Sequence, residues 1–167
     1  MPKNKFETKK LVFASLFAAL TFVSTYVSFP IVIGYVNLGD CFVILSGLIL
    51  GPYGIASAII GSVICDLILG YAVYIPATFI IKGLMAFTVY ILAGKKYSLI
   101  RQILAAFLAE AIMVAGYFLY ECFCMGMGMG ALASIPYNCL QGGVAIIAST
   151  VLYVILDKTK IVKRIKL

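Results

Sequence analysis

The chain has 167 residues, a formal net charge of +7 and a hydrophobic content of 64%. A soluble domain is nearer half apolar, so this composition excludes an ordinary soluble protein and predicts an all-α, polytopic membrane protein. The basic residues flank apolar segments, which excludes the basic stripe of a nucleic-acid-binding protein. The chain contains no His, so histidine-based catalysis and histidine metal sites are excluded as well.

Six apolar segments follow one another along the chain, and about 20 apolar residues suffice to cross a bilayer. The first begins near Leu11 and is too long for a signal-peptide core, so we expect a membrane helix there. The second and third are short, and we expect them to tilt or, for the second, to cross only partly. Short connections predict a single membrane domain, residues 1–167, with spans at about 11–29, 40–51, 55–70, 75–93, 99–121 and 137–156.

The basic residues predict the orientation of these spans. Twelve of the 13 Lys and Arg residues lie in three clusters, at residues 3–10, 95–101 and 158–166. Cytoplasmic flanks of membrane helices are rich in Lys and Arg. Six spans place both termini and the connection between spans four and five on one side, so we expect both termini to be cytoplasmic.

Two connections on the predicted outer side are unusual. Residues 30–39 form a loop punctuated by Pro and Gly. Residues 125–130 alternate Met and Gly, which is typical of a mobile, adaptable lid but also of a loosely packed loop. Together with Cys122 and Cys124 they are also a candidate Cu(I) site, because thiolates and thioethers suit that ion.

Charged and polar side chains within the spans are the main functional signal, because a charge inside a bilayer is costly. Lys82, within span four, is the single basic residue outside the three clusters, and Thr78 shares its helix face. Asn138 and Gln141 likewise share a face. We expect several such faces to converge in an outward-opening pocket with aromatic walls from Tyr74, Tyr117 and Tyr137.

Lys82 is the first candidate for contact with a ligand, with Asp66 or Glu121 keeping it charged. The alternative is an internal ion pair that only holds the helices together. Glu110 lies at mid-depth in span five, far from the other polar residues, and is expected to be structural.

The first span carries small residues at helical spacing, with Ser15 beside Ala14, Ala18 and Ala19. Such a face lets another helix approach closely. It either packs inside the bundle or contacts a partner subunit.

Several motifs are absent. The chain has no GxxxxGK[ST] loop for ATP, no HExxH and no Ser/His arrangement for hydrolysis. We therefore expect no enzymatic activity, no cofactor and no resident metal. Transport against a gradient would draw its energy from another polypeptide.

Residues 34–92 resemble the substrate-binding S components of energy-coupling factor (ECF) vitamin transporters, in the branch with riboflavin-, hydroxymethylpyrimidine- and pyridoxine-type members. The matching motifs are NLGD at 37–40, GPYG at 51–54, DL and GY within 66–71, and PATFIIKG at 76–83. The resemblance implies a bacterial cytoplasmic membrane protein that binds a vitamin in its outer half, gated by the loop after helix one. It also implies docking on a transmembrane coupling subunit and two cytoplasmic ATPases, with Ala14 and Ala18 matching the family's AxxxA-like face.

These observations favour capture of a pyridoxine- or hydroxymethylpyrimidine-like ring ahead of riboflavin, because the candidate residues are polar and include a Lys. The alternatives are a self-contained proton-coupled carrier or channel, with Glu110, Asp66 and Lys82 as its relay, and a Cu(I) transporter. The candidate partner contacts are Ala14, Ala18 and Ala19. The candidate substrate-binding residues are Lys82, Asn138, Gln141, Tyr117, Glu121, Asp66, Asn37, Asp40, Thr78 and Tyr74.

Overall fold

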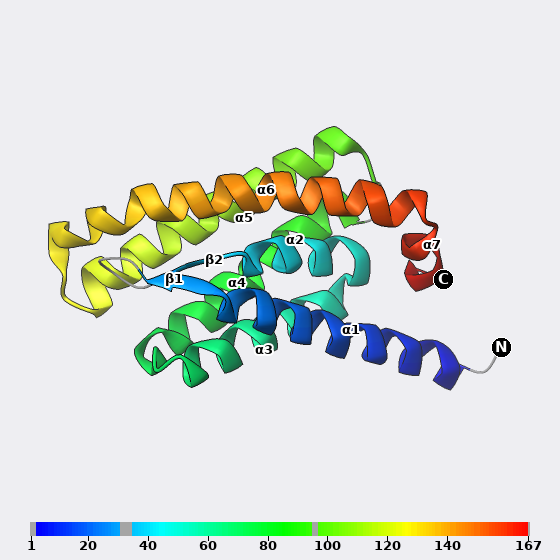
Figure 1. The fold of residues 1–167 in the computed structure, drawn as a ribbon, viewed down its shortest axis with the longest axis horizontal. Coiled ribbons are helices and arrows are strands. Elements are labelled where there is room, and N and C mark those ends of the chain that lie inside the picture. The colour runs from blue at the N-terminus through cyan, green and yellow to red at the C-terminus, as the bar shows by residue number, and fades with distance from the viewer. Residues whose placement is uncertain (1–2, 31–34, 95–96, 167) are drawn as a thin grey trace.

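In a computed structural model of the chain, residues 3–30, 35–94 and 97–166 are described, and helices form most of this part (Figure 1). Two 3-10 helices and two π-helical turns extend or join the α-helices; they are η1 (Ala72–Tyr74), η4 (Gly128–Ser134), η2 (Tyr90–Gly94) and η3 (Tyr120–Cys124). The α-helices are α1 (Lys3–Tyr26), α2 (Gly39–Leu50), α3 (Pro52–Ile68), α4 (Ile75–Val89), α5 (Leu99–Leu119), α6 (Ile135–Lys158) and α7 (Ile161–Lys166).

Each of the six predicted spans coincides with a helix, but the helices differ in length. α2 has 12 residues and α3 has 17, so both are short for a full crossing. Four helical stretches in the described part are long and apolar enough to cross a membrane: Thr8–Tyr26, Ala72–Gly94, Leu99–Cys124 and Gly128–Lys158. The predicted class, an all-α polytopic membrane protein, is thereby confirmed.

α2 lies at the centre of the bundle, where it packs against α1, α3, α4 and α6. Eleven of its 12 residues are buried, and a helix that is apolar all round belongs in such a position. Asp40 stands in its first turn. The central helix therefore carries a carboxylate into the interior of the bundle.

Proline and glycine set the helix boundaries. Pro52, Pro76 and Pro136 occupy the first turn of α3, α4 and α6, where a missing N–H costs nothing. Gly51 has a φ of 59°, which lets the chain reverse sharply between α2 and α3. This reversal falls at the first residue of the GPYG motif, 51–54.

The elements that carry the described basic residues, apart from Lys82, lie at one end of the molecule. The start of α1, the start of α5 and α7 all lie at this end in Figure 1. Lys9 Nζ donates to the carbonyl oxygen of Arg164, and Val162 and Ile165 of α7 are buried. The sequence did not predict α7, which covers the end of α2 that precedes Gly51.

Both predicted outer connections contain more structure than expected. The loop at 30–39 includes strand β2 (Tyr35–Asn37), which pairs antiparallel with β1 (Ser28–Pro30); residues 31–34 lie outside the described part. The predicted loop at 122–136 is largely helical, because positive φ angles at Gly126 and Gly128 turn the chain and η4 then leads into α6.

Candidate functional site

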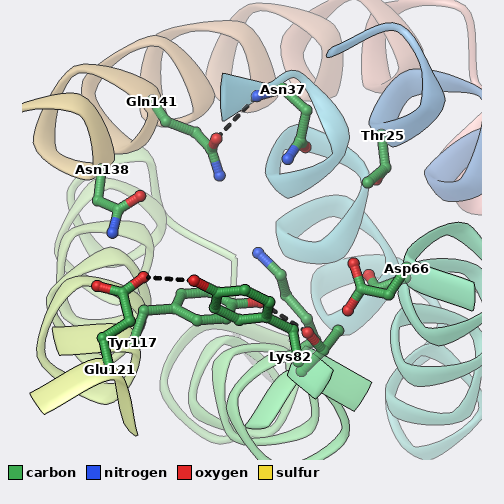
Figure 2. A pocket seen from close by; sticks show the side chains of 11 residues that line it. Thr25, Asn37, Asp66, Lys82, Tyr117, Glu121, Asn138 and Gln141 are labelled. Carbon is green, nitrogen blue, oxygen red and sulfur yellow. Dashed lines mark hydrogen bonds between the residues drawn. The ribbon is translucent and has the colours of Figure 1, made fainter. Parts of the chain in front are cut away.

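A polar pocket lies at the end of the bundle opposite the basic residues, beside the β1–β2 hairpin. Its cavity volume is about 40 Å³. Side chains from α1, β2, α3, α4, α5 and α6 converge on it, together with residues of η1 and η3 (Figure 2). The lining residues are Thr25, Asn37, Ser62, Asp66, Tyr74, Thr78, Lys82, Tyr117, Glu121, Asn138 and Gln141.

The sequence thus identified nine of these eleven lining residues. The tenth candidate, Asp40, contacts the pocket through Lys82. Asp40 Oδ1 accepts a hydrogen bond from Lys82 Nζ and the two form an ion pair, with both side chains buried. The expected partners of Lys82, Asp66 or Glu121, were therefore wrong: α2 begins deep enough to place its own carboxylate beside α4.

Asp40 also connects Lys82 to the β1–β2 hairpin through hydrogen bonds. Gln141 Nε2 donates to Asp40 Oδ2 over 2.5 Å, and Gln141 Oε1 accepts from the backbone N–H of Asn37 over 2.8 Å. Asn37 Oδ1 in turn accepts from the N–H of Gly39 over 2.7 Å. One continuous set of polar contacts therefore joins α4, α2, α6 and β2 beneath the pocket.

Tyrosines and a second acid form another wall. Tyr74 donates to Glu121 Oε1 over 3.2 Å, and Ser134 of η4 donates to Glu121 Oε2 over 2.5 Å. The hydroxyls of Thr78 and Tyr117 lie 3.0 Å apart, and Lys82 Nζ lies 5.5 Å from the centre of the Tyr117 ring. The pocket therefore offers an aromatic ligand the ring faces of two tyrosines, several hydroxyl groups and the ammonium group of Lys82.

Sequence reasoning missed Thr25 and Ser62 as lining residues and Ser134 as a support for Glu121. Ser62 precedes Asp66 by one helical turn, so the sequence does place the two on one helix face, although Ser62 was not among the candidates. Thr25 sits in the last turn of α1, next to the hairpin that the sequence did not reveal. Tyr137, expected as an aromatic wall, is instead 39% exposed and does not line the pocket.

Glu110 is closer to the site than expected. Its carboxyl is buried, and neither oxygen has a hydrogen-bond partner within the described residues. It lies close enough to Asp40 and Lys82 to interact with their charges. The expectation of a remote residue was therefore wrong. Gly142 of α6 packs closely over Glu110, since a Cβ at Gly142 would lie 3.0 Å from the Glu110 Cβ.

The small-residue face of the first helix is divided between the interior and the surface. Ala14 is buried in the core, and the Ala18 carbonyl packs against Gly61 of α3, where a Cβ would come within 2.5 Å of it. Ala19 is exposed, as is Ser15. Within the subunit, Ala14 therefore lies in the core and Ala19 lies on the surface, and a contact of this face with a partner stays a prediction.

The Cys/Met segment is largely exposed. Cys124 and Met129 are exposed. No group of three or more His, Cys, Asp or Glu residues in the described part could hold a metal ion. The segment does lead into η4, whose Ser134 touches the pocket wall, while its function as a lid stays a prediction.

Comparison with known proteins defines the class of this bundle. A structure titled as the S component of a bacterial ECF transporter superposes with a TM-score of 0.77 at 25% identity, covering 92% of this chain and 98% of that chain. No curated protein matches significantly. The fold is thus that of the S component of an ECF transporter.

The sequence profile described as "ECF-type riboflavin transporter, S component" matches residues 5–158. The chain belongs to this family. It is therefore a vitamin-capturing membrane subunit, not a member of an enzyme class, and its partners are the subunits of an energy-coupling module.

Proposed function

We propose that the protein captures a small, ring-shaped vitamin or vitamin precursor in the polar pocket, with a pyridoxine- or hydroxymethylpyrimidine-like compound as the favoured substrate. The observation that carries this proposal is the lining: all eleven residues have a side chain that can form hydrogen bonds. A small ring with hydroxyl groups and ring nitrogens can satisfy such a lining. Riboflavin is the next candidate, on the family's description, although its three fused rings favour an apolar slot.

Binding requires the pocket to open. A cavity of about 40 Å³ holds a few water molecules and no vitamin. We propose that the connection after α1 moves to admit the ligand. The Asn37–Gln141 hydrogen bond holds β2 to α6, and this bond would break when the connection moves. The tip of this connection, residues 31–34, lies outside the described part.

We further propose that all six helices from α1 to α6 belong to the membrane domain of residues 1–167, in a bacterial cytoplasmic membrane with both termini inside. The basic clusters at one end of the bundle support this orientation (Figure 1). The pocket then opens outward. The proposed partners are one transmembrane coupling subunit and two cytoplasmic ATPases, with the exposed Ser15 and Ala19 of α1 at the coupling interface.

Mass spectrometry of small molecules that co-purify with the protein tests the substrate. We expect a pyridine or pyrimidine with hydroxyl groups, which should then bind the purified protein in a titration. Co-purified riboflavin would favour the second candidate, whereas tight binding of none of these compounds would contradict the proposal.

Reconstitution of the chain alone tests the independent-carrier alternative. Liposomes with a proton gradient and no ATP should show no accumulation of the vitamin. Accumulation under these conditions would contradict function as an S component, because a protein of that class needs ATPase subunits to transport.

A further inference from the structure

The pocket region carries an excess of acidic groups. Asp66 and Glu121 line it, and Asp40 lies directly behind Lys82; all three carboxyl side chains are buried. Lys82 is the one basic residue among the lining side chains of the described part. Its charge is already balanced by Asp40.

The two remaining acids flank the pocket. Figure 2 shows Asp66 and Glu121 on opposite sides, with Lys82 between them. An anionic group bound beside Lys82 would compete with Asp40 for the ammonium group. On either side of the pocket it would also approach a carboxyl group, that of Asp66 or that of Glu121. Like charges placed together at a binding site cost several kcal/mol, about a hundredfold or more in affinity.

Neutral hydrogen-bonding groups are plentiful in the same pocket. The Asn138 amide lines the pocket, and Ser62 Oγ is buried there without a hydrogen-bond partner among the described residues. These groups suit hydroxyls, ring nitrogens and carbonyls, which carry no charge. A buried polar group left unpaired costs affinity, so neutral polar ligands gain most from them.

We propose that this site selects neutral or cationic forms of its vitamin and rejects anionic forms, above all phosphate esters, with Asp66 and Glu121 as the residues that set this specificity. The inference rests on the proposed function and holds for each candidate vitamin. Discrimination arises from repulsion of the wrong ligand as much as from contacts to the right one.

Titration of the purified protein with matched ligand pairs tests the inference. The pairs are pyridoxal with its 5′-phosphate, hydroxymethylpyrimidine with its phosphate ester, and riboflavin with its 5′-phosphate. In the pair that contains the vitamin, we expect the ester to bind about a hundredfold more weakly or worse. An ester that binds within about threefold of its parent compound would overturn the inference while leaving the proposed function intact.

Charge variants provide the second measurement. The double variant Asp66→Asn, Glu121→Gln keeps the side-chain sizes and removes both flanking charges, so the ratio of the two affinities should shrink by about tenfold or more. The control is Asp157→Asn, near the cytoplasmic end of α6, which changes the net charge equally and should leave the ratio unaltered. An unchanged ratio in the double variant would overturn the assignment of Asp66 and Glu121.

The outcomes separate the two proposals. Binding of a parent vitamin with weak binding of its ester supports both. Binding of the parent and the ester alike contradicts only the selection by charge, and binding of neither member in all three pairs contradicts both.

Discussion

Lys82 of α4 and Asp40 of α2 form a buried ion pair at the base of the pocket, although 41 residues separate them in the chain. Burying two charges is costly, and removing one partner leaves the other uncompensated. We expect Lys82→Met and Asp40→Leu each to destabilise the fold by about 3–5 kcal/mol, and the double variant to lose less than the sum.

Denaturation of the four proteins of this cycle, the parent included, measures the coupling. Additive losses, with no coupling energy, would contradict an ion pair between these two residues.

Gln141 joins Asp40 to the backbone of Asn37, so its loss leaves two buried groups without a partner. Gln141→Leu should destabilise the protein by about 1–3 kcal/mol per unpaired group, and it should also weaken vitamin binding because Gln141 lines the pocket. The matched control is Gln102→Leu, a buried glutamine on α5 that donates to the Ser149 carbonyl far from the pocket. The control should lose stability but keep its affinity in a titration, and equal affinity losses in the two variants would count against this role of Gln141.

The first helix offers a prediction on the coupling interface. Ala19 is exposed and Ala14 is buried, so a tryptophan should act differently at the two positions. Ala19→Trp should block transport by the assembled complex and leave vitamin binding intact. Ala14→Trp should destabilise the protein itself, because overpacking a core costs about 1–3 kcal/mol or more.

A control for Ala19→Trp is Ile147→Trp on the exposed face of α6, where transport should continue. Loss of vitamin binding in Ala19→Trp would show that this face acts within the bundle.

Two glycines test the packing of the helices. A Cβ at Gly61 would lie 2.5 Å from the Ala18 carbonyl oxygen, whereas a Cβ at Gly143 would meet nothing within 4 Å. Gly61→Ala should therefore lower the melting temperature. Gly143→Ala should raise it slightly, since alanine in a helix interior is favoured over glycine by about 0.5–1 kcal/mol. Similar melting temperatures for the two variants would contradict the close contact of α1 with α3.

The sequence allowed most of the pocket to be predicted because charges inside apolar spans are expensive and therefore informative. Lys82, Glu121 and Asp66 could be identified in this way. The pairing of Lys82 with Asp40 could not be predicted, because it depends on the depth at which each helix starts. Periodicity places residues around a helix and does not fix its height relative to its neighbours.

The short elements were also beyond prediction. The three-residue strands β1 and β2 form through pairing with each other, and residues 28–37 show no long alternating pattern. Ala14 is buried and Ala19 is exposed, and this difference likewise depends on which side of α1 meets α3. A face of small residues fits inside a bundle as well as between subunits.

The central claim is that the pocket around Lys82 is the vitamin site, and titration of the Lys82→Met protein tests it most directly. The substitution keeps the side-chain length and removes the charge, and Lys158→Met at the exposed C-terminal end of α6 is its control. We predict that Lys82→Met binds its vitamin about ten- to a hundredfold more weakly than the parent, while Lys158→Met binds unchanged. A folded Lys82→Met protein with the parent's affinity would contradict the claim.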